Sequence, residues 1–134
     1  MSTDTPRPSL LTASAQAPAE PPPFAPVWAN RGTMHQFSPL PGITMWSATG
    51  GKLMFNFVRL DPGAVVPTHH HPHEQAGTVL EGMIRLTIGD ETRDLRYGDV
   101  YIIPPNVPHS ATTDEHGCLV IDIFTPPRED YQPQ

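Results

Sequence analysis

Between Lys52 and Pro127 the sequence is divided into short apolar runs, each closed by glycine or proline. No stretch in this region carries the 3.6-residue apolar period of a helix over several turns. Many short runs separated by turn residues are typical of an antiparallel β-sandwich or barrel. We therefore expect an all-β fold.

The turn residues predict where the strands end. An Asp-Pro-Gly turn at 61–63 separates two strands, and Gly89-Asp90 closes a hairpin. Gly82 is expected to close another hairpin just before it. Prolines interrupt the alternation between 27 and 49, which is consistent with one or two edge strands. From residue 52 onward the expected strands cover 52–60, 64–71, 75–82, 83–90, 91–99, 100–106, 109–117 and 118–127.

At 134 residues the chain has room for one modest domain with a single core. Residues 1–26 are rich in proline, alanine, serine and threonine and show neither a helical nor a strand period. We expect a disordered proline-rich arm over 1–26 and a single β-barrel domain over 27–134.

Charge and cysteine content argue against several kinds of partner and location. A formal net charge of −6, with no lysine- or arginine-rich run, argues against nucleic acid and anionic membranes. The single cysteine, Cys118, cannot form an internal disulfide, which fits a reducing compartment at least as well as secretion. No apolar run approaches the ~20 residues of a membrane span, and the N-terminus does not resemble a signal peptide. We expect a soluble cytoplasmic protein.

The stretch THHHPHEQ, residues 68–75, contains four histidines. Alternate side chains of a strand face the same side, so His69, His71 and Gln75 are expected to point together. His109 follows the rigid turn PPNVP and can approach them from a distant strand. Because first-row metals in such sites usually need three or four ligands, these four residues are our candidate metal site.

The remaining histidines are expected in solvated loops. They are His35, His70, His73 and His116. His73 shares the parity of the candidate ligands, so it replaces Gln75 if the turn at Pro72 bulges. Four neutral ligands would leave the charge of a divalent ion intact and make it a stronger Lewis acid. The spacing leaves the metal open among Zn, Ni, Mn and Fe.

Two sequence patterns resemble the motifs of the cupin family. The pattern G-x5-H-x-H-x3-Q-x6-G at 63–82 resembles the first cupin motif, in which glutamate is usual at the position of Gln75. The pattern G-x5-P-x-N-x2-H at 98–109 resembles the second, with Asn106 where glycine is commoner. Asparagine tolerates the left-handed turn that this glycine serves. The resemblance implies a small jelly-roll barrel, also called a double-stranded β-helix.

A second group of candidate residues lies in the stretch CLVIDIFTPPRED at the end of the chain. Asp122 and Phe124 share a face of the last expected strand, and an inward carboxylate needs a partner, as a general base does. Arg128 follows two prolines and suits a bidentate carboxylate contact. The alternative is that Asp122 faces solvent, Phe124 fills the core and Arg128 pairs with Glu129 or Asp130.

The combination of HHHPHEQ with IDIFTPPREDY resembles the KdgF-type cupins of pectin and alginate degradation, over about residues 55–131. The resemblance implies a divalent metal on His69, His71, Gln75 and His109, and active-site roles for Asp122, Phe124 and Arg128. The implied reaction opens the ring of a 4,5-unsaturated uronate to give a linear keto uronate. Its small-molecule substrate is then an anionic sugar.

Two other functions stay open at this level. One is an iron-dependent cupin dioxygenase, and the other is a non-catalytic cupin that binds a small molecule or a metal. We also expect a homodimer, because Trp46, Phe55 and Phe57 offer apolar surface for association, although a role in the core is equally compatible with these rings.

Overall fold

The computed structural model describes residues 24–133, which form eight β-strands and one short 3-10 helix. The strands are β1 (His35–Leu40), β2 (Ile43–Thr49), β3 (Met54–Leu60), β4 (Val65–His69), β5 (Glu74–Ile88), β6 (Glu91–Leu95), β7 (Val100–Ile103) and β8 (His109–Thr125), followed by η1 (Glu129–Tyr131). The prediction of an all-β fold is confirmed. The predicted disordered arm lies outside the described residues, apart from 24–26.

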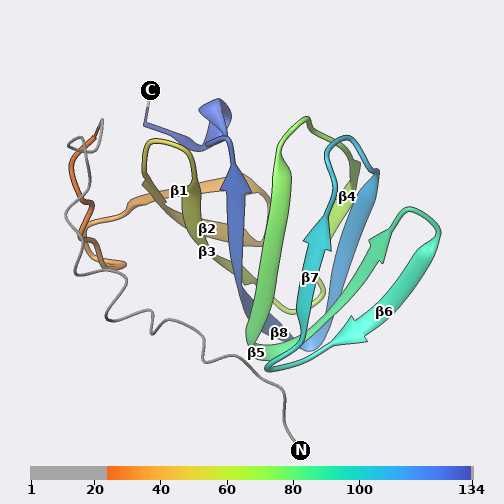
Figure 1. The fold of residues 1–134 in the computed structure, drawn as a ribbon. Coiled ribbons are helices and arrows are strands. Elements are labelled where there is room, and N and C mark those ends of the chain that lie inside the picture. The colour runs from red at the N-terminus through yellow and green to blue at the C-terminus, as the bar shows by residue number, and fades with distance from the viewer. Residues whose placement is uncertain (1–23, 134) are drawn as a thin grey trace, which may run out of the picture.

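The long strands β5 and β8 belong to both layers of the fold. Residues 118–124 of β8 pair with β3, whereas its first residues pair with β4. β5 stays paired with β8 along both halves and adds β7 to the first layer and β6 to the second. The layers are therefore β1-β2-β3-β8-β5-β7 and β4-β8-β5-β6. Figure 1 shows the two halves of β8 diverging from a bend at the bottom of the view.

The hairpin predicted at Gly82 is wrong, because β5 continues through this residue. The two strands predicted over 109–127 are likewise one strand, β8, which continues through Gly117. Both glycines have a left-handed backbone, with φ of 75° and 74°, and the register between the strands shifts on either side of Gly82. The glycines mark β-bulges that bend two paired strands together, a feature that resembles a turn in sequence.

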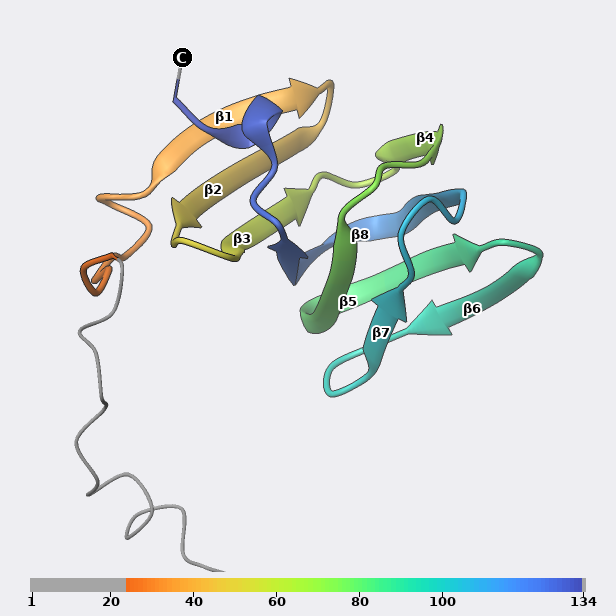
Figure 2. The same ribbon diagram turned by 45° about the horizontal axis from the view of Figure 1, so that its top comes forward.

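The other predicted turns are confirmed. The turn at 61–63 joins β3 to β4, and the Gly89-Asp90 turn joins β5 to β6. Two strands, β1 and β2, occupy the region from 27 to 49; β1, which contains Pro39, lies at the sheet edge. In Figure 2, β1, β2 and β3 lie at one end of the molecule, and β6 and β7 lie at the other.

Every second side chain along the strands points between the layers, and these side chains fill the space there. In β3, Met54, Asn56, Val58 and Leu60 are buried, while the residues between them face outward. Apolar side chains of β2, β5, β7 and β8 complete the core. Within residues 24–133, no helix is long and apolar enough to cross a membrane. Cytoplasmic location stays a prediction.

Substitution of Gly82 tests how much the bend of β5 and β8 contributes to stability. A Cβ atom on Gly82 would lie 2.2 Å from the backbone oxygen of Gly117, and its φ of 75° is unfavourable for other residues. We expect Gly82→Ala to lower the free energy of unfolding by more than about 2 kcal/mol, because strain and a backbone clash add together.

Gly89→Ala is the matched control, since Gly89 has a φ of 61° but no atom within 4 Å of an added Cβ. It should cost only about 1 kcal/mol. Chemical denaturation of both variants measures the difference, and equal losses would show that the close contact at Gly82 is unimportant.

Candidate functional site

Three histidines converge at one end of the space between the layers. His69 is the last residue of β4 and His109 is the first of β8, and the two are paired in register. His71 lies in the loop after β4, so a loop and not strand parity brings it to the group. Nitrogen atoms of the three rings all lie within 4.8 Å of one another.

The loop that carries His71 is held by the second motif. The backbone N–H of Asn106 donates to the carbonyl oxygen of His71 at 2.8 Å. Asn106 has a φ of 65°, the left-handed conformation expected from the sequence. The turn before His109 therefore also fixes the loop before β5.

The orientation of the three rings leaves one nitrogen of each available. The Nδ1 atoms of His69, His71 and His109 lie 2.8, 3.0 and 2.8 Å from the carbonyl oxygens of Pro67, His73 and Val107. A carbonyl can only accept, so each Nδ1 carries the proton and each Nε2 keeps a lone pair. Nε2 of His109 is buried without a hydrogen-bond partner among the described residues.

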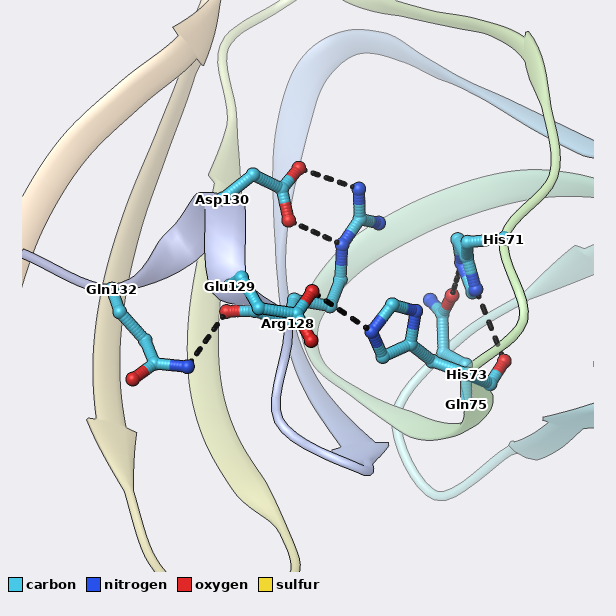
Figure 3. Close-up of polar contacts among 7 residues, drawn as sticks. All are labelled: His71, His73, Gln75, Arg128, Glu129, Asp130 and Gln132. Carbon is cyan, nitrogen blue, oxygen red and sulfur yellow. Dashed lines mark hydrogen bonds and ion pairs between the residues drawn. The ribbon is translucent and has the colours of Figure 1, made fainter.

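Gln75 links this group to the acid. Its side chain hydrogen-bonds Asp122, and this bond lowers the pKa of the carboxyl group, as an amide N–H donor does. The amide oxygen, Oε1, lies 3.1 Å from Nε2 of His71 (Figure 3). Two acceptor atoms thus face each other, which is unfavourable unless a cation lies near both. The donor set fits a bound metal ion.

Burial keeps His71 and His109 neutral by lowering the pKa of each. It lowers the pKa of His71 to about 4, with a further contribution from the positive charges of Arg128 and His109. Burial also lowers the pKa of His109. Neutral imidazoles at pH 7 have the lone pairs that metal binding requires.

Asp122 lines the cavity between the layers, which argues against the alternative in which it faces solvent. The hydroxyl of Tyr101 donates to Oδ1 of Asp122 at 2.6 Å. Burial raises the pKa of Asp122, although the hydrogen bonds from Tyr101 and Gln75 oppose the rise. The pKa of Tyr101 lies well above its usual value through burial and the nearby carboxylate, so Tyr101 stays a donor.

Sequence reasoning missed Tyr101. It shares an inward face with Ile103 in β7, and both side chains are buried. Gly77 on the paired strand makes room for its ring, since an added Cβ would lie 2.2 Å from Cζ of Tyr101. The available signal was the parity of Tyr101 in an apolar strand, because a buried phenol needs a hydrogen-bond partner.

Arg128 lies over the aromatic rings at the cavity wall. Its Cζ atom is 4.1 Å from the ring centre of Tyr131 and 5.3 Å from that of Phe124. Phe124 is buried and packs edge-on against His71, with ring centres 5.5 Å apart. The guanidinium group is paired with Asp130, as the alternative reading of the sequence had it.

The prediction that His73 is solvated is wrong, because only 7% of this residue is exposed. Its Nε2 lies 3.7 Å from a carboxylate oxygen of Glu129 in η1, which covers the loop. His73 does not take the place of Gln75 beside His71. His70 and His116 are exposed, as expected, although His116 lies in β8 and not in a loop. The prediction of a solvated loop is wrong for His35, which is half-buried in β1.

The cavity has a volume of about 350 Å³, in the range of small-molecule sites. Its wall contains both polar and apolar side chains. The polar lining includes His69, Gln75, His109, Asp122 and Arg128, and the apolar lining includes Ile43, Met45, Val58, Leu60 and Leu86. The structure thus brings every predicted site residue to the cavity or, for His71, to its histidine group.

The chain is similar to known proteins over the same region. A family model described as the cupin domain matches residues 56–124. The chain is 34% identical over 90 residues to the pectin degradation protein KdgF of Dickeya dadantii (strain 3937), covering 66% of this chain and 79% of the relative. It is 33% identical over 84 residues to an H2HPP isomerase of Bacillus subtilis, covering 61% of this chain and 36% of that relative. The solved structure of KdgF from Halomonas sp. superposes with a TM-score of 0.74 at 32% identity, covering 81% of this chain and 100% of that chain.

Metal binding can be tested without a substrate. We expect His69→Ala to weaken the binding of a divalent ion by about 100-fold or more, because one of a few ligands is lost. Mass spectrometry of bound metal after dialysis, with calorimetric titration of the metal-free protein, measures the change.

His70→Ala is the control, since the neighbouring His70 is exposed and outside the group. It should bind metal like the unchanged protein. Equal retention of metal by both variants would contradict the proposed site.

Proposed function

The chain belongs to the cupin domain family, and from that premise we propose that it is a metal-dependent enzyme that opens the ring of an unsaturated uronate or a related sugar acid. The predicted resemblance to KdgF-type cupins is confirmed. The observation that carries the proposal is Asp122, an acid with a raised pKa in the same cavity as Arg128 and two of the three grouped histidines. The pectin degradation protein and the isomerase among its relatives support this reaction class.

His69, His71, His109 and Gln75 would hold the metal in this proposal. The lone pairs on the Nε2 atoms and on the amide oxygen support the assignment. A divalent ion bound there supplies Lewis acidity toward a hydroxyl or carbonyl oxygen. Imidazole ligands suit Zn, Ni and Fe, and a carbonyl oxygen such as that of the Gln75 amide also suits Mn.

Asp122 would move the proton of the reaction. Opening a 4,5-unsaturated uronate removes a proton from the anomeric hydroxyl, breaks the bond between carbon 1 and the ring oxygen, and adds a proton at carbon 4. The product has an aldehyde and a ketone and the same atoms as the substrate. A carboxyl group with a raised pKa is suited to accept and return this proton. Tyr101 holds Oδ1 and fixes the orientation of the carboxyl group.

Arg128 and Phe124 would bind and orient the sugar. The guanidinium group provides two parallel N–H donors that match the carboxylate of a uronate. Phe124 forms part of the cavity wall beside His71, and the apolar side chains opposite exclude water. Arg128 and the metal would supply local positive charge in a chain whose formal net charge is −6.

Asp122→Asn tests the proton-transfer role. The change keeps the size of the side chain but removes the acid, so we expect kcat to fall by about 100-fold or more while bound metal is unchanged. Tyr101→Phe should have a smaller effect, about tenfold, because the acid stays while one hydrogen bond is lost. Loss of absorbance of the ring double bond of unsaturated galacturonate follows the reaction.

Full turnover by Asp122→Asn would disprove the assigned role. If the wild-type protein carries metal but does not convert unsaturated galacturonate, unsaturated uronates are excluded as its substrates. If such a protein consumed oxygen after loading with Fe(II), the dioxygenase hypothesis would replace the present one. Binding without any turnover would favour a non-catalytic cupin.

We also propose a homodimer through the outer face of the larger layer. Two cross-strand rows there are almost wholly apolar. They are Trp46, Phe57, Ile121, Thr78 and Val100, and Ala48, Phe55, Ile123, Ala76 and Ile102. None of the three aromatic rings belongs to the core cluster, and Ile102 is 62% exposed. The guanidinium group of Arg31 lies over the rings of Trp46 and Phe57 at one end of this band, with its Cζ atom 5.5 and 5.8 Å from the ring centres. The rows themselves contain no charged residue, and an apolar band across five strands is suited to pair with a second copy.

Light scattering during size-exclusion chromatography tests this association. We expect the unchanged protein to elute as a dimer and Ile102→Lys to shift it toward the monomer, because a charge in the band must be desolvated. Val65→Lys is the control, since Val65 is 55% exposed on the other layer. A monomeric wild-type protein would contradict the dimer.

A further inference from the structure

We propose that Asp130 binds the guanidinium group of Arg128 at the position where the carboxylate of the ligand would bind. Only a ligand that has a carboxylate of its own displaces Asp130 from Arg128. This proposal rests on the proposed function, because it concerns the side of the same cavity that would bind the sugar acid. It assigns to Asp130 a role in selecting acids over neutral sugars.

The contact between the two residues has the geometry of carboxylate binding. Nε of Arg128 donates to Oδ1 of Asp130 at 3.1 Å, and Nη2 donates to Oδ2 at 2.8 Å (Figure 3). Two parallel bonds of this kind are how an arginine binds a free carboxylate. Both residues also line the cavity. A ligand carboxylate that binds Arg128 through these two donors must therefore displace Asp130.

The two partners differ in how firmly they are held. The side chain of Arg128 is 13% exposed and lies over the rings of Phe124 and Tyr131. The side chain of Asp130 is 58% exposed and sits in the short η1 helix. In an exchange the guanidinium group would stay in place while Asp130 turns into water.

Moving the side chain of Asp130 into water requires little free energy, because this side chain is already half solvated and charged. Partial burial raises the pKa of Asp130, but the hydrogen bonds and charge of Arg128 outweigh it, and the pKa lies below its usual value. A carboxylate ligand restores the two bonds that Arg128 loses. A neutral sugar does not, so displacing Asp130 would leave a largely buried guanidinium group without its partner. The exchange therefore discriminates by charge.

Glu129 provides a natural comparison within the same helix. Its side chain is 83% exposed and faces His73 at 3.7 Å, whereas the bidentate contact to Arg128 comes from Asp130. Removing the charge of Glu129 changes the net charge of η1 by the same amount as removing that of Asp130. The two changes separate competition for Arg128 from a general charge effect.

The experiment measures binding of galacturonate and of neutral galactose to the metal-loaded protein by calorimetry. We expect Asp130→Asn to lower the Kd of galacturonate about three- to tenfold, since a competing ion pair is weakened, and to leave galactose unchanged. Glu129→Gln should leave both values unchanged. Arg128→Gln should remove the preference for the acid.

Weaker or unchanged galacturonate binding by Asp130→Asn would overturn the proposal, because Asp130 would then be a structural support for Arg128. Equal tightening for galactose would overturn it too, as would the absence of galacturonate binding to every variant. The readout needs no turnover. If unsaturated galacturonate is not converted but the binding shift is found, the proposed reaction fails while the role of Asp130 stands.

Reaction of Arg128 with phenylglyoxal, followed by peptide mass mapping, gives an independent measurement. We expect faster modification in Asp130→Asn than in Glu129→Gln, and protection by galacturonate. Equal rates in the two variants would show that Asp130 does not restrict access to Arg128.

Discussion

The close backbone contact between Gly82 and Gly117 is the constraint on which the rest of this structure depends. It lets β5 and β8 bend together and stay paired on both sides of the bend, so each strand serves both layers. One strand, β8, therefore presents His109 from one layer and Asp122 from the other to the same cavity. A straight strand would carry these two side chains far apart, since thirteen residues at about 3.3 Å each span roughly 40 Å.

The site depends on hydrogen bonds that fix which atoms face inward. Carbonyl oxygens hold Nδ1 of the three histidines and leave Nε2 free for a metal. Gln75 then joins this group to Asp122, and the hydroxyl of Tyr101 holds Oδ1 of the acid. The candidate metal ligands and the acid thus form one connected network around a carboxyl group whose pKa is raised by burial.

Much of the fold and of the candidate site follows from the sequence, but only where the signal is local. The spacing of His69, His71 and His109 identified the histidine group that the structure brings together. A glycine in a bulge looks the same in sequence as a glycine in a turn, and at Gly82 only the pairing with β8 distinguishes the two. Tyr101 was missed because its role depends on Gly77 across the sheet, and His73 is buried only because η1 returns over it.

We propose that the three Nε2 atoms and the amide oxygen of Gln75 hold a divalent metal ion. A crystal structure of the metal-loaded protein, with anomalous diffraction recorded at the absorption edge of the metal, tests it most directly. We expect one anomalous peak about 2.0–2.3 Å from these four atoms, with the amide nitrogen of Gln75 toward Asp122. No peak there, or an amide nitrogen facing His71, would contradict it.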